Sequence, residues 1–206
     1  MGIIGHTVSC PTIVLAGVLI AGCATGGGAH VTVGTTLTPA QEAGLANVKA
    51  FVDAAARAYQ VQPPALMVAD HAGDATAGAV YRRGVIIFTS RMLTSPSRDE
   101  ATAHELGHYV LRHDQPSSRT PEEIEHQANI EAVLILETVK GVSEEAALRE
   151  VVAALDRTHR AVKAGAGLAR GHAHPCEEIR AVVVAYPAQR GWTAALECAP
   201  TQWGQR

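Results

Sequence analysis

The strongest constraint on this chain is the pentapeptide His104-Glu105-Leu106-Gly107-His108. Residues four apart in an α-helix lie on one face, so His104 and His108 can direct both imidazoles at one ion. Imidazole nitrogen is a common ligand of zinc, which binds four ligands tetrahedrally. Glu105 adjoins the first histidine, where its carboxylate can take a proton from metal-bound water. The alternative is a helix with two surface histidines beside a carboxylate, so a third ligand has to decide.

The residues around this motif predict that it is helical. The segment 97–100 (SRDE) has the pattern of a capping box, which predicts a helix from there to about His113. His113 itself turns partly off the ligand face and is expected to be structural. The segment 120–123 (TPEE) is a second capping box and predicts a helix to about Lys140, where Gly141 provides a stop.

The second helix offers the third ligand. Glu125 and Asn129 fall on one of its faces, and the small Ala128 lets a neighbouring antiparallel helix approach closely. Other acidic residues lie nearby, and it is the register with Asn129 that selects Glu125. Asn129 would then orient a ligand by hydrogen bonding. The sequence therefore predicts one zinc ion per chain, bound by His104, His108 and Glu125, with an open fourth position for water.

The remaining pattern predicts an α+β fold that is mostly helical with a small sheet. Apolar runs at Leu66–Ala69 and Val85–Phe88 are typical of strands, and the Gly/Ala-rich stretch His71–Ala79 is typical of a loop. Further helices are predicted from Thr38 to the Pro63-Pro64 pair, from Ser143 to before Gly165, and from Pro175 to about Tyr186.

Composition limits the partners of the chain. Its 206 residues suffice for one ordinary domain, and 47% apolar but only 4% aromatic residues imply a core of Ala, Val, Leu and Ile. The formal net charge is −3 and the Lys and Arg residues are scattered. This distribution argues against a nucleic-acid partner and against a polybasic membrane-binding surface.

The N-terminal region has the features of a targeting signal. Residues 1–22 read as a lipoprotein-type signal peptide, because a short apolar stretch ends in Leu19-Ile20-Ala21-Gly22-Cys23, which resembles a bacterial lipobox. Cleavage before Cys23 would leave that thiol lipidated and the protein anchored in the membrane of the cell envelope. Residues 23–37 are expected to be a flexible leash, and 38–206 a single domain. No Lys or Arg precedes Pro11, so an uncleaved anchor or a buried helix is the alternative.

Cysteine usage agrees with export. Cys10 would leave with the signal peptide and Cys23 would be lipidated, which leaves Cys176 and Cys198. Two cysteines in an oxidising compartment favour a disulfide, and the alternative is a pair of buried thiols.

Four motifs together resemble the HtpX-like and CAAX-prenyl-endopeptidase-like gluzincins. They are the strand and turn at 84–93, the helix at 99–108 followed by His113, the Glu-x-x-Ala-Asn pattern at 125–129, and the His-Pro-x-x-x-x-Arg pattern at 174–180. The four occur in the family's order and span about residues 66 to 186. Where the family usually has an aspartate, this chain has Asn129, and it lacks the transmembrane helices of HtpX-like members.

The resemblance implies a zincin-type fold and hydrolysis of peptide bonds in proteins, with Glu105 as general base on zinc-bound water. It implies that His174 lies near the metal, where it stabilises an oxyanion or fills the open position, and that Arg180 supports the site. The strand Val85–Phe88 is expected to be the edge at which an extended substrate pairs. The resulting prediction is a zinc endopeptidase of the cell envelope.

Two alternatives remain. The first is a protease of the ImmA/IrrE type, which also combines HExxH with a Glu-x-x-Ala-Asn-like pattern but acts in the cytosol; the lipobox, the cysteine pair and His174-Pro175 argue against it. The second is a zinc-stabilised lipoprotein that binds partners or misfolded envelope proteins without cleaving them.

Overall fold

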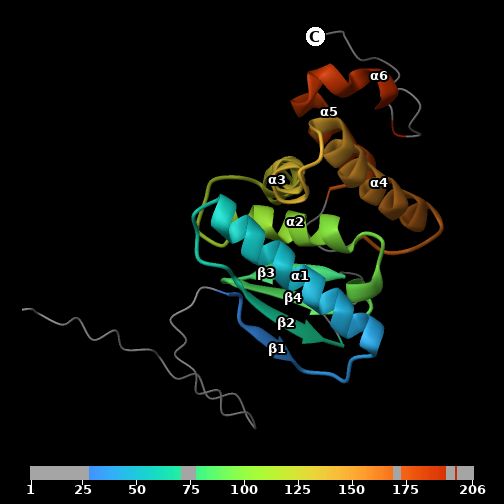
Figure 1. Cartoon of the computed structure of the whole chain (residues 1–206). Helices are drawn as coiled ribbons and strands as arrows, with labels where there is room; N and C mark the ends of the chain where they lie inside the picture. Colours follow the sequence, from blue (N-terminus) through green and yellow to red (C-terminus); the bar gives the residue numbers. More distant parts are fainter. Residues whose placement is uncertain (1–27, 71–77, 169–172, 194–197, 199–206) are drawn as a thin grey trace, which may run out of the picture.

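A computed structural model describes residues 28–70, 78–168, 173–193 and 198 (Figure 1). The predicted α+β class is confirmed, since most of the described residues are helical and the rest include one small sheet. The elements are β1 (Val31–Val33), α1 (Pro39–Ala58), β2 (Ala65–Ala69), β3 (Ala79–Arg82), β4 (Val85–Thr89), η1 (Met92–Thr94), α2 (Arg98–Val110), α3 (Pro121–Lys140), α4 (Glu144–Lys163), α5 (Pro175–Ala185), η2 (Pro187–Gln189) and α6 (Arg190–Thr193).

The sheet has the order β1-β2-β4-β3. Strands β1, β2 and β4 are parallel, whereas β3 pairs antiparallel with β4 through a two-residue turn at Arg83-Gly84. Both turn residues have positive φ, 46° and 82°, as a tight hairpin of right-handed twist requires. The prediction that Val85–Phe88 is an edge strand is therefore wrong, because β3 covers it. Strand β3 was missed, since its four residues follow a Gly/Ala-rich stretch and carry a weak pattern.

The predicted leash is also partly wrong. Val31–Val33, inside the expected leash of 23–37, forms β1 and pairs with Leu66–Val68 of β2. All three residues of this stretch are β-branched, so it favours an extended strand over the flexible linker that the neighbouring glycines indicate. The expected signal peptide and Cys23 lie outside the described residues. Among the described helices none is long and apolar enough to cross a membrane.

The predicted capping box at Thr120 of α3 is confirmed, the predicted helix start at Thr38 of α1 also has a capping box, and Gly141 ends α3 in the left-handed conformation. The box at Ser97 is wrong. The Ser97 hydroxyl makes no cap bond to α2 and instead accepts hydrogen bonds from Nη2 and Nε of Arg157, at 2.6 and 3.1 Å. A charged guanidinium is a stronger partner than a backbone amide, so a residue from α4 outcompetes the local cap.

The core lies between the sheet and the helices. Leu66 and Val68 of β2 and Ile86 and Phe88 of β4 are fully buried, and the apolar faces of α1 and α2 pack in the same cluster. Helix α3 contacts α1, α2, α4 and α5, which joins the sheet region to the C-terminal helices (Figure 1). The side chains are mainly Ala, Val, Leu and Ile, as the composition predicts.

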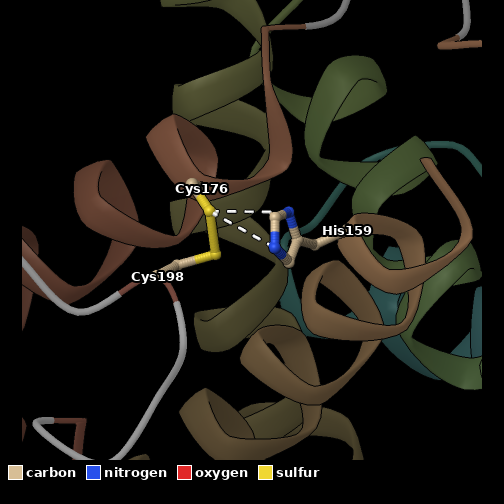
Figure 2. Close-up of side chains that lie close together, drawn as sticks. All are labelled: His159, Cys176 and Cys198. Carbon is tan, nitrogen blue, oxygen red and sulfur yellow. Dashed lines mark hydrogen bonds between the residues drawn. A yellow bond between two sulfur atoms is a disulfide. The ribbon is translucent and has the colours of Figure 1, made fainter. Parts of the chain in front are cut away.

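The predicted disulfide between Cys176 and Cys198 is present. It joins cysteines that are 22 positions apart in the sequence and ties residue 198 to the first turn of α5 (Figure 2).

Helices α2 and α3 approach most closely at Gly107. A Cβ placed on this glycine would lie 2.8 Å from the backbone oxygen of Ala128 and 3.2 Å from its Cα. The predicted close approach at Ala128 is thus confirmed, although the helices cross rather than run antiparallel (Figure 1). Only a glycine opposite a small residue permits this separation, and the separation sets the reach of Glu125 toward α2.

Substitution Gly107→Ala is expected to lower the free energy of unfolding of the metal-free protein by about 1–3 kcal/mol, because the added methyl forces backbone against backbone. The better helix propensity of alanine offsets up to about 1 kcal/mol of this loss. Gly191→Ala is the matched control, since a Cβ there meets no atom within 4 Å. Urea unfolding in the presence of a chelator measures both; a Gly107→Ala protein as stable as the parent would contradict the packing argument.

Candidate metal centre

The three predicted ligands meet at one point between α2 and α3. The Nε2 atoms of His104 and His108 lie 3.1 Å apart. Glu125 of α3 reaches both, with Oε2 at 3.2 Å from Nε2 of His104 and Oε1 at 3.4 Å from Nε2 of His108. All three side chains are largely buried. Residues 104 and 108 share a helix face, and the crossing at Gly107 brings α3 close enough for a carboxylate to reach that face.

These separations suit a tetrahedral zinc ion. Ligand atoms about 2.0–2.1 Å from a tetrahedral zinc lie about 3.3 Å from one another. The three distances of 3.1, 3.2 and 3.4 Å are close to that value. Two imidazoles and one carboxylate are also a ligand set that zinc accepts while keeping a fourth position open. Chemistry and spacing therefore both fit the predicted metal.

The charges around His104 also favour a cation. Burial lowers the pKa of His104, but the carboxylate of Glu125, followed by those of Glu105 and Glu100, outweighs this and raises the pKa to about 10. A buried site with this excess of negative charge is stabilised by whatever cation occupies it, whether a proton or a metal ion.

The ring of His104 is oriented by Asn129, which Glu178 holds in turn. Its Nδ1 lies 2.9 Å from Oδ1 of Asn129, which is the predicted orienting contact. Asn129 in turn donates from Nδ2 to Oε2 of Glu178 at 2.8 Å. A carboxylate thus supports the ligand through an amide, and it supplies the negative charge that Asn129 lacks.

Sequence reasoning missed Glu178. It lies on α5, is 2% exposed, and burial raises its pKa. The signal was present: Glu178 shares a helix face with Val182, which is fully buried, so it falls on the apolar side of α5. A carboxylate in that position needs a polar partner inside the protein.

His108 is oriented by a second chain of contacts. Its Nδ1 lies 3.0 Å from Nδ1 of His113, and Nε2 of His113 lies 3.2 Å from Oε1 of Gln127. If Nε2 of His108 binds metal, its Nδ1–H donates to His113, which donates onward to the amide oxygen of Gln127. Burial and the neighbouring His108 lower the pKa of His113, which favours the neutral ring that this arrangement requires. His113 therefore has the structural role expected of it.

Glu105 is held by the edge of the sheet. Its Oε2 accepts a hydrogen bond of 2.6 Å from the backbone N–H of Tyr81 in β3, and the residue is 8% exposed. A charged acceptor and a backbone donor make a strong bond, so the carboxylate has a defined position beside the ligand group.

A pocket of about 750 Å³ opens beside these groups. His104 and Glu105 line it, together with Glu100 and Ala101 of α2 and Leu155 of α4. The ends of β3 and β4 and the residues after α4 complete its wall. His104 and Glu105 therefore face a cavity with room for part of a peptide.

The structure does not bring His174 and Arg180 into this arrangement. His174 is exposed; its Nδ1 accepts a hydrogen bond from the N–H of Cys176 and caps α5, and its ring lies 5.4 Å from that of His159. Arg180 is exposed on the same helix. The role of His174 at the metal and the supporting role of Arg180 are thus not borne out by this geometry. The first turn of α5 directs Glu178, not His174, toward the metal ligands.

A second group of ligand-type side chains consists of His159, Cys176 and Cys198 (Figure 2). Nδ1 of His159 lies 3.5 Å from Sγ of Cys176. Both sulfurs are committed to the disulfide, so neither is the thiolate that a metal requires. Of the two groups in the described part of the chain, only the one on α2 and α3 offers side chains in a chemical state that can bind a metal ion.

Comparison with known proteins points the same way. Residues 64–149 match the Peptidase_M78 family model, described as the IrrE N-terminal-like domain. No curated protein and no solved structure matches the chain. The match supports a metallopeptidase of the ImmA/IrrE type, one of the predicted alternatives, and does not support the HtpX-like family in particular. The segment that holds His104, His108 and Glu125 is thus similar to a metallopeptidase domain.

Proposed function

We propose that this protein is a zinc-dependent endopeptidase in which Glu105 is the general base. The observation that carries the proposal is the ligand group itself: two imidazoles and a carboxylate at tetrahedral spacing, with a buried carboxylate on the residue next to the first ligand. The similarity of residues 64–149 to the IrrE N-terminal-like domain supports the same class of chemistry.

A zinc ion bound by these ligands would supply a Lewis acid at its open position, which lowers the pKa of water and polarises a peptide carbonyl. Glu105 accepts the proton of the attacking water and passes it to the leaving amine. The N–H of Tyr81 keeps this carboxylate in place. Asn129 and Glu178 hold the ring of His104, and His113 holds that of His108, so both imidazoles stay directed at the same point.

Strand β3, not β4, is the edge that an extended substrate can join. Gly78 accepts from the N–H of Thr89 in β4, and the N–H of Tyr81 points the other way, to Glu105. Directions alternate along a strand, so the polar backbone groups of Ala79 also point away from β4. Ala79 lines the pocket, so a peptide paired there lies beside the ligand group.

We further propose that the protein acts in the cell envelope, anchored through Cys23. The lipobox-like sequence and the disulfide between Cys176 and Cys198 support this location, because disulfides persist in oxidising compartments. The competing proposal, a cytosolic protease of the ImmA/IrrE type, shares the chemistry and differs in where the substrate is met. A non-cleaving zinc lipoprotein would share the ligands and differ in turnover.

The purified chain is expected to contain about one zinc ion, and Glu125→Ala is expected to lose most of it, because two imidazoles alone leave the ion poorly held. Metal analysis after dialysis measures both proteins. Glu122→Ala, an exposed residue in the first turn of the same helix, is the matched control and should retain zinc. Full occupancy in the Glu125→Ala protein would remove Glu125 from the ligand set.

Glu105→Gln is expected to keep zinc and lose about 10²–10⁴-fold in cleavage of unfolded casein, since the amide cannot accept the proton. Gel-based and fluorescence assays on zinc-verified preparations measure this loss. Equal residual cleavage by parent and variant would favour the non-cleaving zinc lipoprotein.

Expression of the full chain with a labelled fatty acid is expected to place label on the protein, and Cys23→Ser is expected to abolish it, because that thiol is the only proposed attachment point. Cell fractionation should then move the variant out of the membrane fraction. An unlabelled parent protein in the cytosolic fraction would favour the ImmA/IrrE-type alternative.

A further inference from the structure

Glu100 is a buried carboxylate that the proposed reaction does not use. It lies on α2, one helical turn before His104, and lines the same pocket as His104 and Glu105. Only 8% of the residue is exposed. Among the described residues it makes no hydrogen bond and no ion pair. An ionised carboxylate in such a place is costly unless a cation or a donor reaches it.

The positive side chains of the protein meet this requirement only in part. His104 attracts Glu100 most strongly, but its ring is engaged by Glu125 and Asn129. The attraction of Arg157 comes next, but its guanidinium hydrogen-bonds to the Ser97 hydroxyl and the residue is exposed. Burial, the largest influence, raises the pKa of Glu100 to about 7. The positive charges of the protein therefore neutralise this carboxylate poorly. The space that it borders is the pocket.

Part of the wall of the pocket that Glu100 lines is made of small and apolar side chains. They are Ala101 of α2 and Ala154, Leu155 and Ala161 of α4. Such walls suit the methylene stem of a long side chain and leave its charged end for the carboxylate. Four residues of helix rise about 6 Å, so the distance along α2 from His104 to Glu100 is comparable with the reach of an extended lysine.

We propose that Glu100 is the counter-charge of a subsite that binds a lysine or arginine side chain of the substrate next to the cleaved bond. The inference rests on the proposed peptidase function and names its substrate class. The apolar walls favour a side chain over a free α-amino group, which has no stem to bury. The arginines that line the pocket, Arg91 and Arg157, are exposed, so water and salt screen their repulsion far more than the attraction of a buried carboxylate.

The test compares N-acetylated peptides that differ only in lysine or norleucine beside the cleaved bond. The bond is first located by mass spectrometry of a digested mixture of unfolded proteins. For the zinc-loaded parent, kcat/KM is expected to favour lysine by about tenfold or more, the worth of one charge-assisted hydrogen bond. Glu100→Gln, which keeps the shape and removes the charge, is expected to bring the ratio near one, mainly by slowing cleavage of the lysine peptide.

Asp99→Asn is the matched control. Asp99 precedes Glu100 on the same helix turn, but it pairs with Arg98 and Lys140 and does not line the pocket. This variant should keep the lysine preference of the parent. Zinc content and the thermal midpoint confirm that each variant is folded. A ratio near one in the parent, or an unchanged ratio in Glu100→Gln, would overturn the subsite. So would cleavage that requires a free N-terminal amine.

A binding measurement separates this inference from the proposed function. The zinc-loaded Glu105→Gln protein binds the fluorescent lysine and norleucine peptides without turnover, with and without the added Glu100→Gln change. A preference for lysine that depends on Glu100, in a protein whose parent cleaves nothing, would refute the peptidase and keep the subsite. No preference in binding would refute the subsite, whatever the parent cleaves.

Discussion

The contact between Gly107 and Ala128 is the constraint on which the metal centre depends. Two histidines on one helix can hold an ion only in part, and the third ligand must come from another element. A glutamate side chain is short, so its helix has to approach until backbone meets backbone. Gly107 permits this by having no Cβ, at a cost in helix propensity that the surrounding packing offsets. The close crossing, more than the presence of Glu125 in the sequence, is what creates the ligand group.

Support for that group comes from beyond the segment that resembles known metallopeptidases. The family match ends at residue 149, whereas Glu178 lies on α5 and contacts Asn129 from there. Helix α4, which forms one wall of the pocket, lies largely beyond the match as well. The C-terminal helices are thus part of the candidate site and not an appendage. They contribute a carboxylate near one ligand and part of the wall of the pocket.

The sequence was a good guide wherever local chemistry decides the outcome. Thr38, Thr120 and Gly141 mark helix ends through their own backbone and side-chain bonds, and the spacing of His104 and His108 follows from helix geometry. It was a poor guide where distant residues compete. Ser97 bonds to Arg157 from α4, and four residues of β3 form an edge strand because β4 offers them a partner. Motif spacing could place His174 close to Pro175 but could not say which face of α5 turns inward.

The bond from Tyr81 to Glu105 has a consequence for tolerance to substitution. The anchor is a main-chain amide, so no change of side chain at position 81 can remove it, and only proline lacks the required hydrogen. What the anchor does depend on is the register of β3. A slip by one residue would turn the amide of Tyr81 toward β4, put the N–H of a neighbouring residue in its place and move every side chain of β3 to the opposite face of the sheet. The orientation of Glu105 therefore depends on how β3 pairs with β4. It does not depend on which side chain stands at position 81.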